Sequence, residues 1–218
     1  MLSSRLLTVV LLLVLVSASV VLGVRFRNYS LPGNQQGYEP VQPIAFSHRL
    51  HAGDLQIACI YCHSGADRSR HAGIPASSLC MNCHRLVTAS PDAMLQEVQQ
   101  ARQAGRPPQP VISPELVKLY DSLGLDEKMQ PDPAKKLRPI PWVKVHNLPD
   151  FSCFDHRPHV RAGVECQECH GPVQTMERVR QVEDLSMGWC VNCHREKGIA
   201  GVDGKKVKPS TDCAACHY

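Results

Sequence analysis

A short pattern, Cys-x-x-Cys-His, occurs five times in this 218-residue chain and contains all but one of its 11 cysteines. Two cysteines at this spacing reach the two vinyl groups of one porphyrin, while the adjoining imidazole binds the iron. The sequence therefore predicts five covalently attached haem c groups. We number the motifs 1 to 5 along the chain. Their attachment cysteines are Cys59 and Cys62, Cys80 and Cys83, Cys166 and Cys169, Cys190 and Cys193, and Cys213 and Cys216, and their proximal iron ligands are His63, His84, His170, His194 and His217.

Zinc is the alternative partner for these cysteines. The 17 residues between Cys62 and Cys80, and the 20 between Cys169 and Cys190, fit a four-cysteine zinc ribbon. A ribbon has no need of a histidine after every second cysteine, however, and a fifth cysteine pair would have no partner. Disulfides within such close pairs would be strained. Haem accounts for all five motifs, and zinc does not.

Six histidines lie outside the motifs, and low-spin electron-transfer haems need a second axial ligand. The predicted distal ligands are His48, His51, His146, His156 and His159. His71 lies in a basic stretch and is the expected non-ligand, although it remains an alternative axial donor together with Met176 and Met187. A methionine ligand would raise the reduction potential of its haem. The number of histidines outside the motifs therefore favours six-coordinate irons, each with a protein ligand on both axial sides.

The same element, Phe-x-His-x-x-His, precedes each of two haem pairs, at residues 46–51 and 154–159. The attachment motifs that follow begin 21 residues apart in the first half and 24 residues apart in the second. This repetition predicts the duplication of a two-haem unit. The predicted parts of the chain are a transmembrane anchor (1–27), a tether (28–45), a first two-haem module (46–89), a connector (90–141), and a second two-haem module with the fifth haem (142–218).

The connector contains the two segments with conventional helix signals. Ser90-Pro91-Asp92 and Ser113-Pro114-Glu115 each combine a capping serine, a proline at the first helical position and an early acidic residue. Gly105 and Gly124 follow these two segments and predict their ends. The stretch after Gly124 is polar and rich in proline, which indicates a surface segment.

The composition predicts a thin apolar core, because aromatic residues make up 5% of the chain and it contains 17 prolines and 14 glycines. Porphyrins would supply the missing apolar surface. The predicted fold is therefore a mainly α-helical and irregular multihaem cytochrome c, with short helices and loops wrapped around cofactors. The formal charge of +4 does not indicate a nucleic-acid partner, since each ferric haem with its propionates adds about one negative charge. No catalytic constellation is recognisable, and Cys153, outside the motifs, is interpreted as a small buried residue.

The N-terminal segment is apolar and uncharged over residues 7–24, between Arg5 and Arg25. This length can cross a membrane. Small residues near Ser17 would also suit a cleaved signal peptide, but the apolar run continues beyond them, which favours an anchor. Because haem is attached outside the cytoplasm, the sequence predicts a single-pass protein of the cytoplasmic (inner) membrane, with its haem domain on the periplasmic side.

The chain resembles the pentahaem cytochrome subunit of alternative complex III. The resemblance rests on several longer segments and covers nearly everything after residue 44. Cys153 departs from the family pattern, where a residue without a thiol is expected. The segments are Phe46-Ser47-His48 onward to motif 2, including Ala72-Gly73-Ile74-Pro75 and Cys80-Met81-Asn82-Cys83-His84, then Val145-His146-Asn147-Leu148-Pro149-Asp150, His170-Gly171-Pro172-Val173 and Met187-Gly188-Trp189-Cys190-Val191-Asn192-Cys193-His194.

This resemblance implies a haem-carrying conduit in a membrane complex that oxidises menaquinol. The implied partners are an iron-sulfur, molybdopterin-like subunit, polytopic quinol-binding subunits and a monohaem cytochrome c. The electrons would leave to a soluble carrier or a terminal oxidase. The quinol site would belong to other subunits, so this chain would be a non-catalytic electron-transfer subunit.

A second hypothesis is a membrane-anchored multihaem quinol dehydrogenase or reductase subunit that donates to periplasmic reductases. Such a protein needs at least one iron with an open or exchangeable sixth position. Six histidines outside the motifs for five irons favour the conduit instead.

Overall fold

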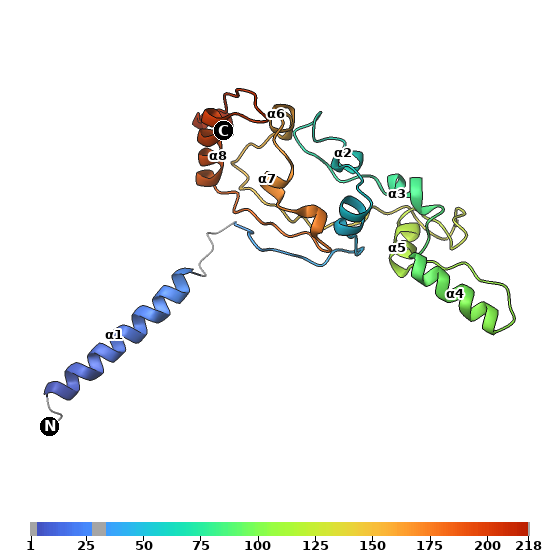
Figure 1. Cartoon of the computed structure of the whole chain (residues 1–218), viewed down its shortest axis with the longest axis horizontal. Helices are drawn as coiled ribbons and strands as arrows, with labels where there is room; N and C mark the ends of the chain where they lie inside the picture. The colour runs from blue at the N-terminus through green and yellow to red at the C-terminus, as the bar shows by residue number, and fades with distance from the viewer. Residues whose placement is uncertain (1–3, 28–33, 218) are drawn as a thin grey trace.

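The structure is a computed structural model that describes residues 4–27 and 34–217 (Figure 1). Within these ranges it contains helices, irregular loops and isolated β-bridges but no β-strand. The predicted mainly α-helical and irregular class is confirmed. Residues 1–3, 28–33 and 218, which include parts of the predicted anchor and tether, lie outside the described ranges. The elements are α1 (Ser4–Arg27), the π-helical turn η1 (Arg49–Asp54), α2 (Cys59–Cys62), α3 (Ser77–His84), α4 (Pro91–Gln103), α5 (Pro114–Ser122), α6 (His156–Ala162), α7 (Gln167–His170), the 3₁₀ turn η2 (Val173–Thr175), α8 (Met187–Ala200) and α9 (Cys213–Cys216).

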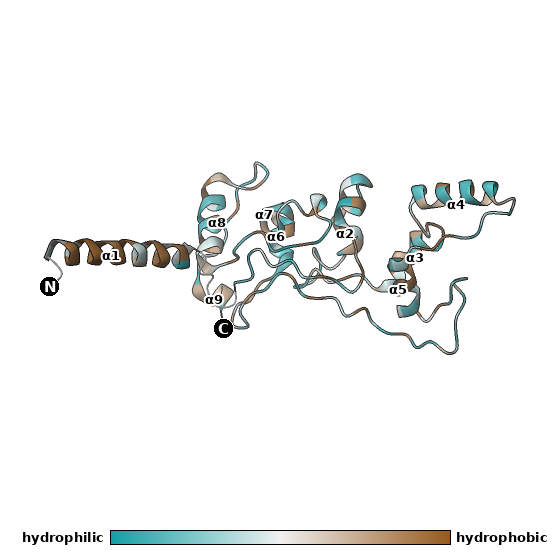
Figure 2. Cartoon of the chain, turned by 90° about the horizontal axis from the view of Figure 1, so that it is seen from below, coloured by the Kyte–Doolittle hydropathy of each residue, from teal (hydrophilic) through white to brown (hydrophobic). Residues whose placement is uncertain are grey.

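Helix α1 is long and apolar. Its stretch Leu6–Arg25 comprises 20 residues with a mean hydropathy of 2.8, and none of it is buried in the structure. Figure 2 shows the helix in the hydrophobic colour along most of its length. About 20 apolar helical residues match the hydrocarbon thickness of a bilayer, although a signal sequence has a similar character. The helix thus suggests a membrane anchor, while the side of the membrane on which the haem domain lies stays a prediction.

Helices α4 and α5 of the connector begin at the predicted caps. The hydroxyl oxygen of Ser90 accepts a hydrogen bond from the amide of Ala93 at 3.3 Å, and that of Ser113 accepts one from the amide of Glu115 at 3.3 Å. A proline follows each cap, at a position whose amide would have no partner within the helix. Both predicted helices are confirmed.

Tyr120 of α5 attaches the connector to motif 2. Its side chain is 1% exposed, and its hydroxyl donates a hydrogen bond to the carbonyl oxygen of His84 at 2.7 Å. A second bond runs from the hydroxyl of Thr88 to the carbonyl oxygen of Val111 at 2.6 Å. The connector therefore supports the backbone that carries the second proximal histidine.

Few apolar side chains are buried within the described ranges. They are Ala66, Ala89, Ala101, Leu119, Tyr120, Met176 and Val202. Three of them are alanines, and a domain of this length ordinarily buries far more apolar surface. Large side chains in motif 1 stay exposed, with Ile60 at 56% and Tyr61 at 47%. This distribution fits a polypeptide that surrounds large apolar groups.

Gln181 is fully buried and joins three segments of the chain. Its side-chain oxygen accepts a hydrogen bond from the amide of Asn147 at 3.2 Å, and its side-chain nitrogen donates to the carbonyl oxygen of Glu183 at 2.9 Å. Its backbone pairs with Gly37 at 2.7 Å and with Tyr38 at 3.1 Å. The described part of the predicted tether therefore lies along the second module (Figure 1).

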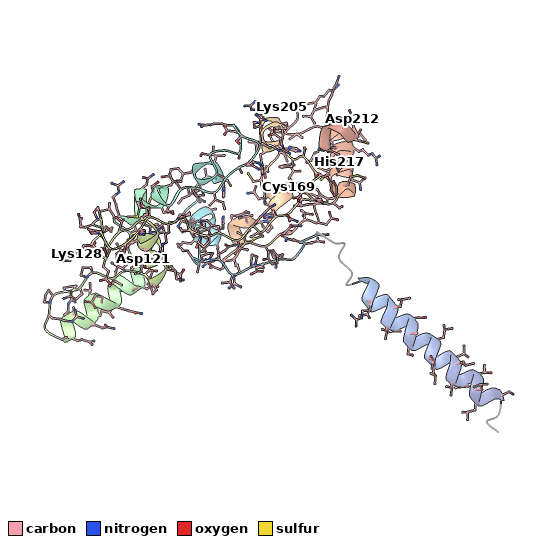
Figure 3. The ribbon with its side chains drawn as sticks, turned by 180° about the vertical axis from the view of Figure 1, so that it is seen from behind. Asp121, Lys128, Cys169, Lys205, Asp212 and His217 are labelled. Carbon is pink, nitrogen blue, oxygen red and sulfur yellow. The ribbon has the colours of Figure 1, made fainter. Side chains whose placement is uncertain are left out.

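The part of the chain after residue 34 is elongated. Figures 1 and 2 place α3, α4 and α5 at one end and α8 near the C-terminus at the other, with α2, α6 and α7 between them. Figure 3 labels Cys169 near the middle and His217 nearer the C-terminal end. The motifs are thus spread along the molecule and do not surround a single centre.

Candidate haem centres

Each Cys-x-x-Cys segment forms at least one helical turn, in α2, α3, α7, α8 and α9. Residues i and i+3 of a helix share a face, so the two thiols of a motif can reach the same porphyrin edge. Polar caps fix two of these turns. The carboxylate of Asp212 accepts a hydrogen bond from the amide of Ala214, and the hydroxyl oxygen of Ser186 accepts one from the amide of Trp189, each at 3.1 Å.

The two Phe-x-His-x-x-His elements repeat one geometry. The ring centroid of Phe46 lies 4.9 Å from that of the first histidine of its element and 4.3 Å from that of the second. The corresponding distances from Phe154 are 4.8 and 4.7 Å. In both elements the first histidine stands edge-on to the phenylalanine, at 85°. The duplication that the sequence indicates therefore extends to the placement of the histidine rings.

Seven histidines turn Nδ1 toward a backbone carbonyl oxygen. An imidazole that donates Nδ1–H keeps Nε2 available for a metal ion. Four of the seven are proximal residues of motifs 1, 2, 4 and 5, and three are predicted distal ligands. The pairs are His51 with Ser47 (2.8 Å), His63 with Gly73 (2.6 Å), His84 with Val87 (2.8 Å), His156 with Arg70 (2.9 Å), His159 with Asp155 (2.8 Å), His194 with Ser210 (2.5 Å) and His217 with Phe151 (3.2 Å).

Three pairs of histidine rings lie at the spacing that suits two axial ligands. Imidazoles bound to opposite sides of one metal ion have ring centroids about 6 Å apart, because each metal–nitrogen bond is about 2.0 Å long. Each of the three pairs joins a proximal histidine to a histidine of a Phe-x-His-x-x-His element. The centroid separations are 6.1 Å for His51 and His84, 6.4 Å for His156 and His170, and 5.9 Å for His159 and His194.

His48 lies beside the proximal residue of motif 1. Burial, followed by the neighbouring His63 and His51, lowers the pKa of His48 to about 4. The ring is therefore neutral near pH 7, and neutral imidazole is the form that binds metals. Its Nδ1 is buried without a hydrogen-bond partner in the part of the chain that the structure describes. A buried, neutral imidazole with an unpaired ring nitrogen beside a proximal histidine fits a metal ligand.

His146 occupies a different place from the other predicted distal ligands. Its Nε2 lies 3.2 Å from Nδ1 of His170, and the two rings meet edge to face with centroids 4.3 Å apart. Burial lowers the pKa of His146. Burial and then His146, His156 and His63 lower the pKa of His170 to about 4. His170 is thus the proximal histidine whose Nδ1 faces another imidazole instead of a carbonyl.

The remaining candidate donors, His71, Met176 and Met187, differ in their exposure. His71 is exposed, in agreement with its interpretation as a surface residue. Met176 is 8% exposed and its carbonyl oxygen accepts a hydrogen bond from the amide of Arg49 at 2.9 Å, which places it beside the first module. Met187 is 69% exposed at the start of α8. Cys153, to which the sequence assigns no ligand role, donates its amide hydrogen to Cys216 at 2.7 Å and so lies at motif 5.

Motif 1 lies between motifs 2 and 3. The pKa of the Cys62 thiol is raised by burial and then by Cys80 of motif 2. The pKa of the Cys166 thiol of motif 3 is raised by burial and then by Cys59 of motif 1, to which it is also hydrogen-bonded. Motif 1 therefore has a cysteine neighbour on each side.

Motif 4 in turn lies between motifs 3 and 5. Burial, followed by Cys193 and Cys190 of motif 4, raises the pKa of Cys169 to about 12. Burial and then Cys216 of motif 5 raise the pKa of Cys190. The five motifs thus form a row in the order 2, 1, 3, 4, 5, which differs from their order in the sequence.

Open space borders the motifs where porphyrins would lie. A cavity of about 550 Å³ lies between motifs 1 and 2, within the range of cofactor sites. Its lining residues are Tyr61, Cys62, Ser64, Pro75, Ala76, Ser78, Leu79 and Asn82. Within the described ranges, no group of three or more His, Cys, Asp or Glu side chains is placed to hold a single metal ion. The histidine spacing, the buried nitrogen and this cavity fit haem c.

Comparison with known proteins agrees with a haem protein. Residues 152–218 match the family described as cytochrome c7 and related cytochrome c. Over 196 residues the chain is 24% identical to the "Menaquinone reductase, multiheme cytochrome c subunit" of Nitratidesulfovibrio vulgaris, an alignment that covers 81% of this chain and 76% of that protein. The predicted multihaem cytochrome fold is thereby confirmed and haem c is supported, while the count of five and the individual ligands remain predictions.

Proposed function

We propose that this chain is a pentahaem cytochrome c that conducts electrons within a membrane-bound menaquinol-oxidising complex of the alternative complex III type. The observation that carries the proposal is the continuous row of motifs 2, 1, 3, 4 and 5. The name of the relative, which links a multihaem cytochrome subunit to menaquinone, supports the setting. Helix α1 supports a membrane location.

The haems would be held by the motif cysteines, the proximal histidines and the Phe-x-His-x-x-His elements. The bound groups supply iron centres that take up and release single electrons. In this proposal His48, His51, His156 and His159 are the distal partners of motifs 1, 2, 3 and 4. This pairing follows the duplication. In each module, the first histidine of the Phe-x-His-x-x-His element would be the distal ligand at the first motif, and the second histidine would be the distal ligand at the second motif.

The row gives the conduit two ends. Motif 2, supported by Tyr120, forms one end, and motif 5, at the C-terminus, forms the other. Electrons would enter at one end and leave at the other, passing through motif 3 in the middle. The donor and acceptor would be other subunits of the complex, namely an iron-sulfur, molybdopterin-like subunit, polytopic quinol-binding subunits and a monohaem cytochrome c, with a soluble carrier or terminal oxidase beyond them.

One observation favours the second hypothesis, a quinol dehydrogenase or reductase subunit. The aromatic ring in contact with His217 is that of Phe151, with a centroid separation of 5.7 Å. Within the described ranges, no predicted distal histidine makes a ring contact with His217. An iron with an exchangeable sixth ligand at motif 5 would bind carbon monoxide. Carbon monoxide binding by the untreated protein would therefore support a substrate-binding haem.

The conduit proposal is tested by purification and turnover. Extraction in mild detergent is expected to yield a large assembly that contains this chain and oxidises menaquinol with a cytochrome c or carrier as acceptor. The separated chain should be reduced by dithionite but should show negligible turnover with menaquinol analogues, because in this proposal the quinol site and its proton-accepting bases belong to other subunits. Rapid quinol oxidation by the separated chain would contradict the conduit proposal.

The number of haems is tested independently. Intact mass and a pyridine haemochrome assay should both give five haems per chain. Cys59→Ser combined with Cys62→Ser should remove one haem, whereas Cys153→Ser is a matched control outside the motifs and should retain all five. A count of four or fewer in the unaltered protein would refute the reading of the five motifs.

A further inference from the structure

His146 and His170 form an imidazole pair unlike the three pairs with axial spacing. Their centroids are 4.3 Å apart at an interplanar angle of 79°, whereas His156 and His170 are 6.4 Å apart in nearly parallel planes at 8°. Two ligands on opposite sides of one iron need about 6 Å. His156 meets that spacing to His170, and His146 is too close.

The atoms in contact define the role of His146. Its Nε2 lies 3.2 Å from Nδ1 of His170. Nδ1 is the atom that the other four proximal histidines direct to a backbone carbonyl oxygen. We propose that His146 is a positioning residue, whose Nε2 accepts a hydrogen bond from Nδ1–H of His170 and so orients the proximal ligand of motif 3.

The backbone near His170 explains why an imidazole fills this place. Helix α7 is a single turn that ends at Gly171, whose φ of +72° redirects the chain away from the helix. Gly171 also lies directly against Val182, where a Cβ atom would collide. The backbone thus turns toward Val182, and the side chain of a distant segment supplies the acceptor for His170.

His146 is itself held in place by the buried amide of Gln181. Gln181 accepts a hydrogen bond from the amide of Asn147, the next residue, at 3.2 Å. The side-chain nitrogen Nε2 of Gln181 donates a hydrogen bond to the carbonyl oxygen of Glu183 at 2.9 Å. Rotation of the Gln181 amide would therefore break both hydrogen bonds. The chain of contacts from Gln181 through Asn147 and His146 reaches Nδ1 of His170, the ring nitrogen that does not bind iron.

A nitrogen acceptor on Nδ1–H has a chemical consequence for the proximal ligand. It increases electron density on the imidazole, makes Nε2 a stronger donor to iron and stabilises the ferric state. The proposal thus predicts that His146 lowers the potential of the haem at motif 3 relative to a protein without this hydrogen bond. This inference rests on the proposed haem assignment, but not on the identity of the surrounding complex.

The test compares His146→Leu, His146→Gln and His156→Leu in the full-length holoprotein. His146→Leu should leave the number of low-spin irons in the electron paramagnetic resonance spectrum unchanged from the unaltered protein and raise one midpoint potential by about 59 mV, which is tenfold in a one-electron equilibrium constant. His146→Gln retains an acceptor oxygen, so its midpoint potential should lie close to that of the unaltered protein. His156→Leu removes a distal ligand and should produce one high-spin iron.

Each outcome decides the proposal. A high-spin iron that is present in either His146 variant but absent from the unaltered protein would make His146 an axial ligand and overturn the positioning role. Unchanged midpoint potentials in His146→Leu would show that His146 serves only in packing, and would also overturn the positioning role. If His146→Leu fails to retain five haems, the His146→Gln spectrum decides, with a low-spin iron at motif 3 expected. The haem count of the unaltered protein and its turnover in the intact complex test the conduit proposal separately.

Discussion

The rings of His156 and His170 lie in planes inclined by only 8°, with their centroids 6.4 Å apart. The two residues come from different elements, α6 and α7, and Nδ1 of each has its own partner, the carbonyl oxygen of Arg70 for His156 and Nε2 of His146 for His170. In the proposed assignment, the Nε2 atoms of these two residues would bind one iron. His159 and His194 have a similar centroid separation of 5.9 Å, with their planes inclined by 33°.

Replacement of single distal histidines should therefore open one iron at a time. His51→Ala and His159→Ala are each expected to convert one low-spin haem to high-spin, because the partner on the other side of that iron is lost. Optical and electron paramagnetic resonance spectra of the purified protein measure this. His71→Ala is the matched control on an exposed histidine, and a spin-state change in that variant would contradict the ligand assignment.

The order of the row predicts the effect of deleting haems from it. With Cys153→Ser as background, a ruthenium photoreductant on a cysteine placed at Thr211, beside motif 5, would inject electrons at one end. Removal of the haem of motif 1 by Cys59→Ser and Cys62→Ser should leave the haem of motif 2 isolated, so that three of the four remaining haems are reduced rapidly.

Removal of the terminal haem is the control for that experiment. Cys80→Ser with Cys83→Ser deletes motif 2 at the end of the row, and all four remaining haems should then be reduced rapidly. Equal amplitudes in the two deletion proteins would show that motif 1 does not lie between motif 2 and the rest.

Tyr120→Phe should destabilise the connector. The change removes the hydrogen bond to the carbonyl oxygen of His84 and leaves a sheltered acceptor without its partner, at a cost of about 1 kcal/mol. Denaturant unfolding of the purified protein, followed at the haem absorbance, measures the loss. Tyr38→Phe, at a residue 41% exposed, should leave the unfolding midpoint unchanged.

The stability of the segment formed by α4 and the loop after it should depend on pH through the carboxyl group of Glu97. Hydrogen bonds from Arg106 and then from the amide of Gln109 lower the pKa of this carboxyl group to about 2. A lowered pKa in the folded state stabilises the protein above the ordinary glutamate pKa of 4.5, and that contribution disappears as the pH falls toward 2. Glu97→Gln should therefore reduce stability at pH 6 and have progressively less effect between pH 4 and pH 2, as measured by urea unfolding at each pH.

Local patterns in the sequence were sufficient for the short elements of the fold. Ser90 and Ser113 cap helices because their hydroxyl groups meet free amides within three residues, and the turn of each Cys-x-x-Cys segment is equally local. The contact between Cys59 and Cys166 could not be predicted in this way. Nothing near either cysteine specifies which motifs meet, because that depends on how the two modules pack.

The place of His146 was beyond prediction for the same reason. Its spacing in the sequence suits a distal ligand, and no local signal distinguishes a histidine that binds iron from one that holds a ligand in place. In the proposed role, the contact of His146 with His170 depends on tertiary packing. The buried amide of Gln181 contributes to that packing by fixing the neighbouring Asn147.

The backbone pairing of Gln181 with Gly37 and Tyr38 also limits how the molecule can stand on a bilayer. The seven peptide steps from Arg27 to Asn34 can extend at most about 25 Å. With α1 embedded in lipid, Asn34 stays within that distance of the end of the helix, and Gly37 and Tyr38, which follow it, are bonded to Gln181 of the second module. A lipid-embedded electron donor would then meet the second module more readily than the connector.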